Sequence, residues 1–229
     1  ALRVRSLPMK KTDKALIDYL TRDEMNALLA APDCTTLAGL RDRAMLHLTY
    51  AAGLRVSELL ALQMDDFPDR SLSTVRVLGK GRRERVLPLW KETQTVLRAW
   101  IAVRHSAQVQ EVFVNREGLP VSRDGFAHRL AVHVAVAARK RPTLMEKRVT
   151  PHVLRHSCAM HTLEATGDIR KVSLWLGHAS LQSTEAYLRV DPAEKLAILA
   201  ANAAPAVPKG RFRTPDKLLA MLAEIQNAR

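Results

Sequence analysis

The stretch TPHVLRHS, from Thr150 to Ser157, predicts the start of a helix that carries both apolar and chemically active side chains. Thr150 suits the capping position and Pro151 the first helical position, so a helix is expected from Pro151 to Ala165. His152 and Arg155 are three residues apart and share one face of its first turns. A helix start attracts phosphate, an arginine fork grips two phosphate oxygens, and histidine transfers protons near neutral pH. A solvated arginine beside a core histidine would give the same spacing, so this pair alone leaves both interpretations open.

Helical patterns dominate the sequence on both sides of this stretch. Thr21 and Glu24 form a capping box, and Thr150 opens the central helix. Alternating residues predict two strands joined by turn glycines, with a third strand near Asp65 to Phe67. The expected fold class is mainly α with a small antiparallel β-sheet. The predicted helices span residues 21–32, 37–53, 55–62, 92–106, 123–139, 151–165, 169–176, 181–188 and 192–201, with a last one from 215, and the strands span 73–78 and 83–89, with a brief extended piece at 112–115.

The composition favours a polyanionic partner. The chain has 229 residues with 47% hydrophobic residues, and 36 Lys and Arg against 23 Asp and Glu give a net charge of +13. No apolar run approaches the roughly 18–20 residues that a membrane helix needs, and the first residues lack a secretory pattern. Cys34 and Cys158 lie far apart, which favours reduced thiols in a cytoplasmic protein.

Four further residues stand in contexts that suit phosphate chemistry. Arg55 follows Gly53 in AGLRVSELLAL and opens a helix, although a simple pairing with Glu58 fits as well. Lys80 lies in the expected hairpin turn of LGKGRRERVLPL, where glycines allow a close approach to a ligand, and an ordinary exposed lysine fits too. His178 follows a glycine in LWLGHASLQST, and Tyr187 comes nine residues later in STEAYLRV. A tyrosine oxygen can attack phosphorus held by cations, or be a half-buried aromatic with its hydroxyl paired.

The ordered set of these residues resembles the tyrosine recombinase family, also called phage integrases. The resemblance runs from about Leu20 to Val190 and is carried by the motifs AGLRVSELLAL, GKGRRERVLPL, TPHVLRHS, LGHASLQST and EAYLRV. It implies the catalytic domain of a site-specific recombinase or integrase.

The resemblance also implies a role for each of six residues. Tyr187 would be the nucleophile that forms a 3′-phosphotyrosyl bond and leaves a 5′-hydroxyl. Arg55 and Arg155 would hold the non-bridging phosphate oxygens. His152 would move the proton of the nucleophile, His178 would donate a hydrogen bond to phosphate, and Lys80 would protonate the departing 5′ oxygen. No metal, ATP or other cofactor is expected.

The same resemblance sets expectations for domains and partners. Residues 1–20 are interpreted as a basic arm or linker, 21–202 as the catalytic domain, and 203–229 as a linker with an amphipathic helix that docks on a neighbouring protomer or folds back. The family usually carries a separate helical DNA-clamping domain before the catalytic part, where this chain has only about 20 residues. Either the chain is truncated or that domain is absent, and the hypothesis is that the chain is a fragment. Double-stranded DNA is the expected partner, bound by a tetramer of protomers that are monomers in solution. Basic clusters at 139–141 and 147–148 are candidates for backbone contact.

Three other functions remain possible at this stage. A metalloenzyme could use His152, His156 and His161 with Cys158, although no glutamate lies inside the histidine pair. A DNA-binding protein without catalysis would fit the charge, and a type IB topoisomerase would share the chemistry.

Overall fold

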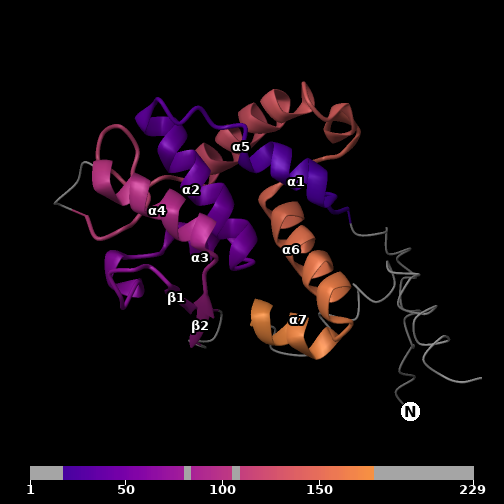
Figure 1. Cartoon of the computed structure of the whole chain (residues 1–229). Helices are drawn as coiled ribbons and strands as arrows, with labels where there is room; N and C mark the ends of the chain where they lie inside the picture. The colour runs from indigo at the N-terminus through magenta and orange to yellow at the C-terminus, as the bar shows by residue number, and fades with distance from the viewer. Residues whose placement is uncertain (1–17, 80–83, 105–108, 178–229) are drawn as a thin grey trace, which may run out of the picture. The chain divides into compact units, whose positions relative to one another are not determined.

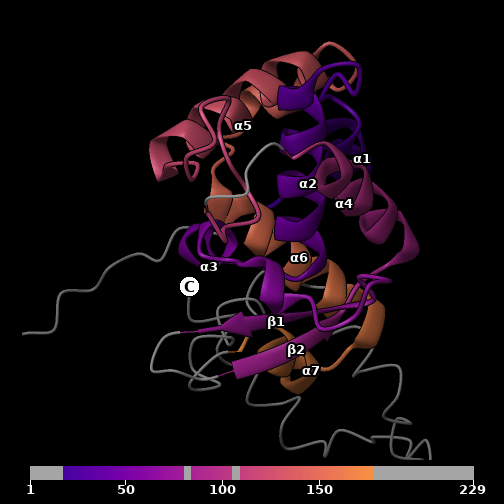
Figure 2. The ribbon, with the colours of Figure 1, turned by 90° about the vertical axis from the view of Figure 1, so that its left-hand side faces the viewer.

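Helix α2 (Leu37–Ala51) lies at the centre of the computed structural model, which describes residues 18–79, 84–104 and 109–177. The helix packs against α4 (Lys91–Val103) and α6 (Pro151–Thr166), as Figures 1 and 2 show. Its residues are buried on several sides, from Ala44 and Met45 to Leu48 and Ala51. A helix covered on several sides belongs in the core of a domain, which explains its weak amphipathic pattern.

Helix α1 (Arg22–Leu29) begins where its capping box predicts. Thr21 accepts a hydrogen bond from the Glu24 main-chain N–H, and the Glu24 carboxylate accepts one from the Thr21 N–H. The helix packs against α5 (Arg123–Ala138), which is followed by the 3₁₀ helix η2 (Pro142–Glu146) that the sequence had not suggested. The predicted helix starts at Arg123, Pro151 and Ile169 are also confirmed.

The small sheet is an antiparallel hairpin of β1 (Thr74–Leu78) and β2 (Glu84–Pro88), paired from Thr74 with Pro88 to Leu78 with Glu84. Its inner face buries Val75, Val77 and Leu87. The predicted third strand near Asp65 is wrong, because the chain forms the 3₁₀ helix η1 (Met64–Asp66) there. The Asp66 carboxylate accepts a hydrogen bond from the Gln63 main-chain N–H at 2.9 Å and so closes a tight turn instead of extending a strand.

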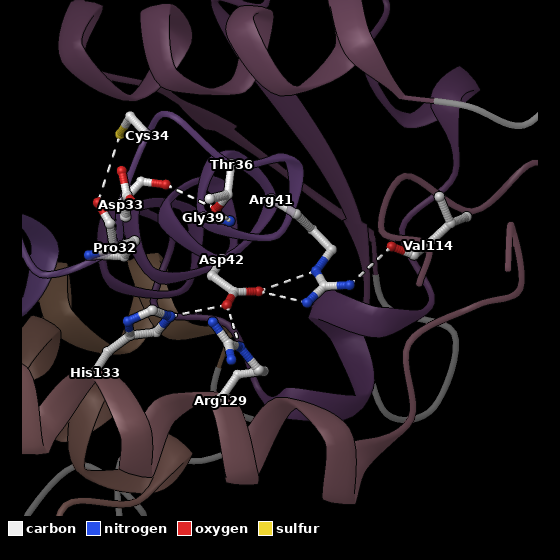
Figure 3. A network of polar contacts seen from close by, with 10 residues as sticks. All are labelled: Pro32, Asp33, Cys34, Thr36, Gly39, Arg41, Asp42, Val114, Arg129 and His133. Carbon is white, nitrogen blue, oxygen red and sulfur yellow. Dashed lines mark hydrogen bonds and ion pairs between the residues drawn. The ribbon is translucent and has the colours of Figure 1, made fainter. Parts of the chain in front are cut away.

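A buried carboxylate ties α2 to α5. Asp42 is 1% exposed and accepts hydrogen bonds from Arg41, Arg129 and His133, whose side chains point toward it in Figure 3. Burial raises the pKa of the Asp42 carboxyl, but the hydrogen bonds from His133 and Arg129 outweigh it and hold that pKa below its usual value. Arg41 also donates to the Val114 carbonyl at 3.3 Å, which anchors the segment between α4 and α5.

Helices α3 (Val56–Leu60) and α7 (Ile169–Leu176) complete the described elements. The hairpin and α7 lie at the same end of this unit in both ribbon views. The fold class is therefore confirmed as mainly α with a small antiparallel sheet. The helices predicted at 181–188, at 192–201 and from 215, and the turn at 80–83, lie outside the described residues, as does the whole of a second unit at 195–229. In the ranges that the structure describes, no helix is both long and apolar enough to cross a membrane.

Candidate active site

Arg155 holds together two chain segments that carry predicted site residues. It lies on α6 and is 4% exposed. Its Nη1 donates a hydrogen bond to the carbonyl of Gly53, and its Nη2 donates one to the carbonyl of Leu176 at 2.9 Å. Gly53 is two residues before Arg55, and Leu176 is two residues before His178. One buried guanidinium therefore fixes the start of α3 relative to the end of α7.

Glu58 is the acceptor around which the arginines gather. It lies on α3 and is 7% exposed. Arg55 Nη1 donates to its Oε1 at 2.7 Å, Arg85 Nη2 donates to its Oε2 at 2.8 Å, and Arg155 Nη1 lies 3.7 Å from Oε2. Burial raises the pKa of the Glu58 carboxyl, but the hydrogen bonds from Arg85 and Arg55 outweigh it and keep that pKa below its usual value. Glu58 therefore stays ionised near neutral pH.

Arg55 is the most exposed of the three arginines. It is the N-cap of α3, its main-chain N–H donates to Glu58 Oε2 at 2.9 Å, and its side chain is 36% exposed. An arginine has five N–H donors, so one hydrogen bond to Glu58 leaves capacity for a ligand. The pairing with Glu58 that the spacing suggested is real, but it is not a weak surface pair, because Glu58 is buried.

His152 is exposed in the first turn of α6, on the same helix as Arg155. The Thr150 hydroxyl caps this helix by accepting from the Val153 N–H at 3.4 Å. Burial lowers the pKa of the neighbouring His156, and electrostatic interactions with His152 and Arg155 lower it further. The first turn of α6 therefore carries a solvent-accessible imidazole on the same helix as the buried Arg155.

Two glycines let these segments approach each other closely. Gly53 has a φ of +56°, and a Cβ there would lie 2.5 Å from Leu176 Cδ2. Gly177 has a φ of +63°, and its Cβ would lie 3.0 Å from Arg85 Cδ. Both values are shorter than ordinary contacts of about 3.5–4.0 Å between carbon atoms. The chain just before His178 therefore rests against β2.

The structure brings part of the predicted site together. Arg55 and Arg155 meet at Glu58, and His152 lies on the helix of Arg155, whereas Lys80, His178 and Tyr187 lie outside the described residues. Glu58 and Arg85 were missed as members of the site. The signal for Arg85 was its place in the strand alternation, since it shares the inner face of β2 with Leu87.

Other candidate residues have structural partners. His161 is 5% exposed, and its Nδ1 lies 2.8 Å from the Tyr50 hydroxyl. In the described ranges no group of three or more His, Cys, Asp or Glu side chains could hold a metal ion. Lys147, a candidate for DNA backbone contact, instead donates to Glu24 Oε2 at 2.6 Å and to the Tyr19 carbonyl at 3.1 Å.

Comparisons with known proteins identify the family to which the chain belongs. The model of the phage integrase family matches residues 18–194. The protein y4rC of Sinorhizobium fredii, which bears the name integrase/recombinase, is 40% identical over 220 residues, covering 96% of this chain and 66% of that protein. The tyrosine recombinase XerC of Xylella fastidiosa is 42% identical over 181 residues, covering 79% of this chain and 59% of XerC.

Solved structures of recombinases also match this chain. The crystal structure of XerA recombinase matches with a TM-score of 0.68 and 27% identity, over 80% of this chain and 64% of XerA. XerH recombinase bound to its difH substrate matches with a TM-score of 0.69 at 23% identity, over 81% of this chain and 53% of XerH, which shows a shared fold. This chain spans less than two thirds of the length of these relatives. The family match over most of its length shows that the chain belongs to the phage integrase family, the tyrosine recombinases.

Proposed function

We propose that this chain is the catalytic part of a site-specific DNA recombinase or integrase that cleaves and rejoins strands through a 3′-phosphotyrosyl intermediate. The observation that carries the proposal is the buried Glu58 that holds Arg55, Arg85 and Arg155 together. Three arginines and one carboxylate give a local charge of 3 − 1 = +2. A preorganised cluster of this sign suits a phosphodiester, whose negative charge increases in the transition state.

The six residues divide the reaction among them. The Tyr187 oxygen attacks phosphorus and passes its proton to His152, while the bond from phosphorus to the 5′ oxygen breaks. Lys80 gives a proton to that leaving oxygen. Arg55 and Arg155 stabilise the non-bridging oxygens, and His178 donates a hydrogen bond to one of them. The phosphotyrosyl bond keeps the energy of the broken bond, so a 5′-hydroxyl can reverse the reaction without ATP or a metal.

Double-stranded DNA is the proposed partner, with a monomer in solution and a tetramer on two duplexes. The net charge of +13 supports binding to a polyanion, which weakens as salt rises. Both cysteines are free thiols, in keeping with a cytoplasmic protein. We propose the division at 1–20, 21–202 and 203–229, with the last segment docking on a neighbouring protomer. Deleting residues 203–229 should weaken assembly on DNA and spare binding to one site, and unchanged assembly would reject the docking.

Trapping of the covalent intermediate tests the proposed reaction. The protein is mixed with nicked duplexes made from DNA flanking its gene, so that the short 5′ piece diffuses away after cleavage. We expect a nucleotide adduct on Tyr187 by mass spectrometry, and none in Tyr187→Phe. An adduct on another residue would overturn the assignment of Tyr187.

Two other results would point to the alternatives. Relaxation of a plasmid without a recombination site would favour topoisomerase-like activity. Site-specific binding by the full-length protein without any adduct would favour a DNA-binding protein that does not cleave.

A further inference from the structure

Arg85 is a charged residue on the buried face of a strand. Along β2 the side chains alternate, so Arg85 lies on the same face as the buried Leu87, while Val86 on the opposite face is 60% exposed. The Arg85 side chain is 10% exposed. Arginine is rarely buried to this extent without a partner that compensates for the loss of hydration.

The partner is Glu58. Arg85 Nη2 donates to Oε2 at 2.8 Å and Nη1 donates to Oε1 at 3.3 Å, a two-pronged contact with both carboxylate oxygens. Its Nε is buried and has no hydrogen-bond partner within the described ranges. A buried donor without a partner costs free energy. The orientation of Arg85 therefore satisfies both Glu58 oxygens while its own Nε stays unsatisfied.

Arg85 also contacts the segment that leads to His178. The position of a Cβ on Gly177 would lie 3.0 Å from Arg85 Cδ and 3.2 Å from its Nη1. Lys80 precedes β2 in the sequence, between the two strands of the hairpin. Arg85 is therefore linked to the segments that carry three of the predicted catalytic residues. It binds Glu58, which binds Arg55, and it contacts Gly177, which precedes His178. It also lies on the hairpin whose turn contains Lys80.

We propose that Arg85 is a positioning residue for strand cleavage, which holds Glu58, and through it Arg55, in register with the hairpin and with the segment before His178. This inference rests on the proposed function and deepens it. Arg85 itself does not touch the phosphate. It acts by fixing the carboxylate that orients the phosphate-binding arginine.

The charges around Glu58 determine what the loss of Arg85 would do. The charged groups that face Glu58 in the described ranges are Arg55 at the start of its own helix, Arg85 from β2 and Arg155 from α6. Without Arg85 the burial of Glu58 remains and one cation is lost, so its pKa must rise. Protonated Glu58 no longer attracts Arg55, and cleavage should then fail at a higher pH than in the wild type.

The experiment measures single-turnover cleavage of the nicked duplex as a function of pH in the wild type, Arg85→Gln and Arg85→Lys. The amplitude reports the correctly folded fraction, and the rate constant reports the chemistry of that fraction. For Arg85→Gln we expect a rate constant lower by about 10- to 100-fold, as small misplacements of catalytic groups produce. The acid limb should move up by about one pH unit or more, and the Kd for DNA should hardly change. Arg85→Lys keeps the positive charge but loses the two-pronged guanidinium contact. Its rate constant and acid limb should therefore lie between those of the wild type and Arg85→Gln.

A matched control is Arg76→Gln. Arg76 lies on the neighbouring strand β1 and pairs with Asp66 at the surface, so its loss should leave the rate constant and the pH profile unchanged. In a Glu58→Gln background the further change Arg85→Gln should cause no shift of the acid limb. A shift that persists there, or an Arg85→Gln profile that superposes on the wild type, would overturn the inference.

A measurement without DNA separates this inference from the proposed function. The pKa of the Glu58 carboxyl, followed by carbon NMR in the wild type and Arg85→Gln, should rise in the variant. If the wild type forms no adduct but this pKa rises, the proposed function fails and the control of Glu58 by Arg85 stands. An unchanged Glu58 pKa in Arg85→Gln would overturn the positioning role whatever the DNA experiments give.

Discussion

Gly53→Ala tests the close packing that brings the ends of α2 and α7 together. The new Cβ would lie 2.5 Å from Leu176 Cδ2 and 3.2 Å from Cys158 Sγ. Restoring an ordinary contact requires a shift of about 1 Å, and such overpacking costs about 1–3 kcal/mol. The φ of +56° adds about 1–2 kcal/mol for a residue with a Cβ. We therefore expect a loss of about 2–5 kcal/mol in the free energy of unfolding.

Gly167→Ala is the matched control for this prediction. Gly167 has a φ of +60°, nearly the same as Gly53, but a Cβ there would meet nothing within 4 Å. Gly167→Ala and Gly53→Ala therefore share the cost of the backbone conformation and the change in the entropy of the unfolded state. Only Gly53→Ala adds a steric overlap. Urea unfolding of both variants should give a difference of about 1–3 kcal/mol. Equal losses in the two variants would refute the packing described between Gly53 and Leu176.

Three further predictions concern buried ionisable groups. Asp42→Asn should lower the free energy of unfolding by about 3–5 kcal/mol in a urea titration, because it leaves Arg41 and Arg129 without their buried counter-ion. A loss as small as that of a surface pair would contradict this. Burial lowers the pKa of His161 to about 4. Between pH 7 and 5 the unfolded state therefore binds a proton at this residue and the folded state does not, so the wild type should lose roughly 2 kcal/mol of stability from this group. His161→Gln should remove that part of the pH dependence, and an unchanged dependence would argue against it. Lys147→Met should cost about 1–3 kcal/mol in a urea titration, because it leaves the buried Glu24 carboxylate without its cationic partner. The exposed Arg148→Ala should change stability by less than about 0.5 kcal/mol, and equal effects would contradict the structural role of Lys147.

The local fold could be predicted wherever a short-range signal decides it. The capping box of Thr21 and Glu24 and the Thr150–Pro151 pair mark helix starts because their hydrogen bonds lie within one turn. The prediction of a strand near Asp65 was wrong, and a short-range signal is again the cause. A side-chain hydrogen bond within the turn, from the Gln63 N–H to Asp66, competes with extended structure. Such competition between local and ladder hydrogen bonds is hard to weigh from residue alternation alone.

The candidate site was only partly predictable because its centre is built from distant segments. The spacing of Arg55 and Glu58 was visible, but nothing local indicates that Glu58 is buried or that Arg85 and Arg155 also reach it. Burial changes the meaning of the pair, from a weak surface contact to an anchor of three cations. The roles of Lys80, His178 and Tyr187 remain predictions from the family resemblance.

The two carbonyl contacts of Arg155 have a consequence for the order of folding. They join this residue to Gly53, 102 positions away, and to Leu176, 21 positions away. A contact across 102 residues costs more loop-closure entropy than a contact within one helix, so we expect the contact with Gly53 to form after the helices themselves. A chain in which α7 has not yet docked lacks the Leu176 carbonyl, one of the two main-chain acceptors that orient Arg155. On the proposed function, the protein should therefore gain the ability to cleave DNA only when α7 has docked, and an incompletely folded chain should not cut DNA.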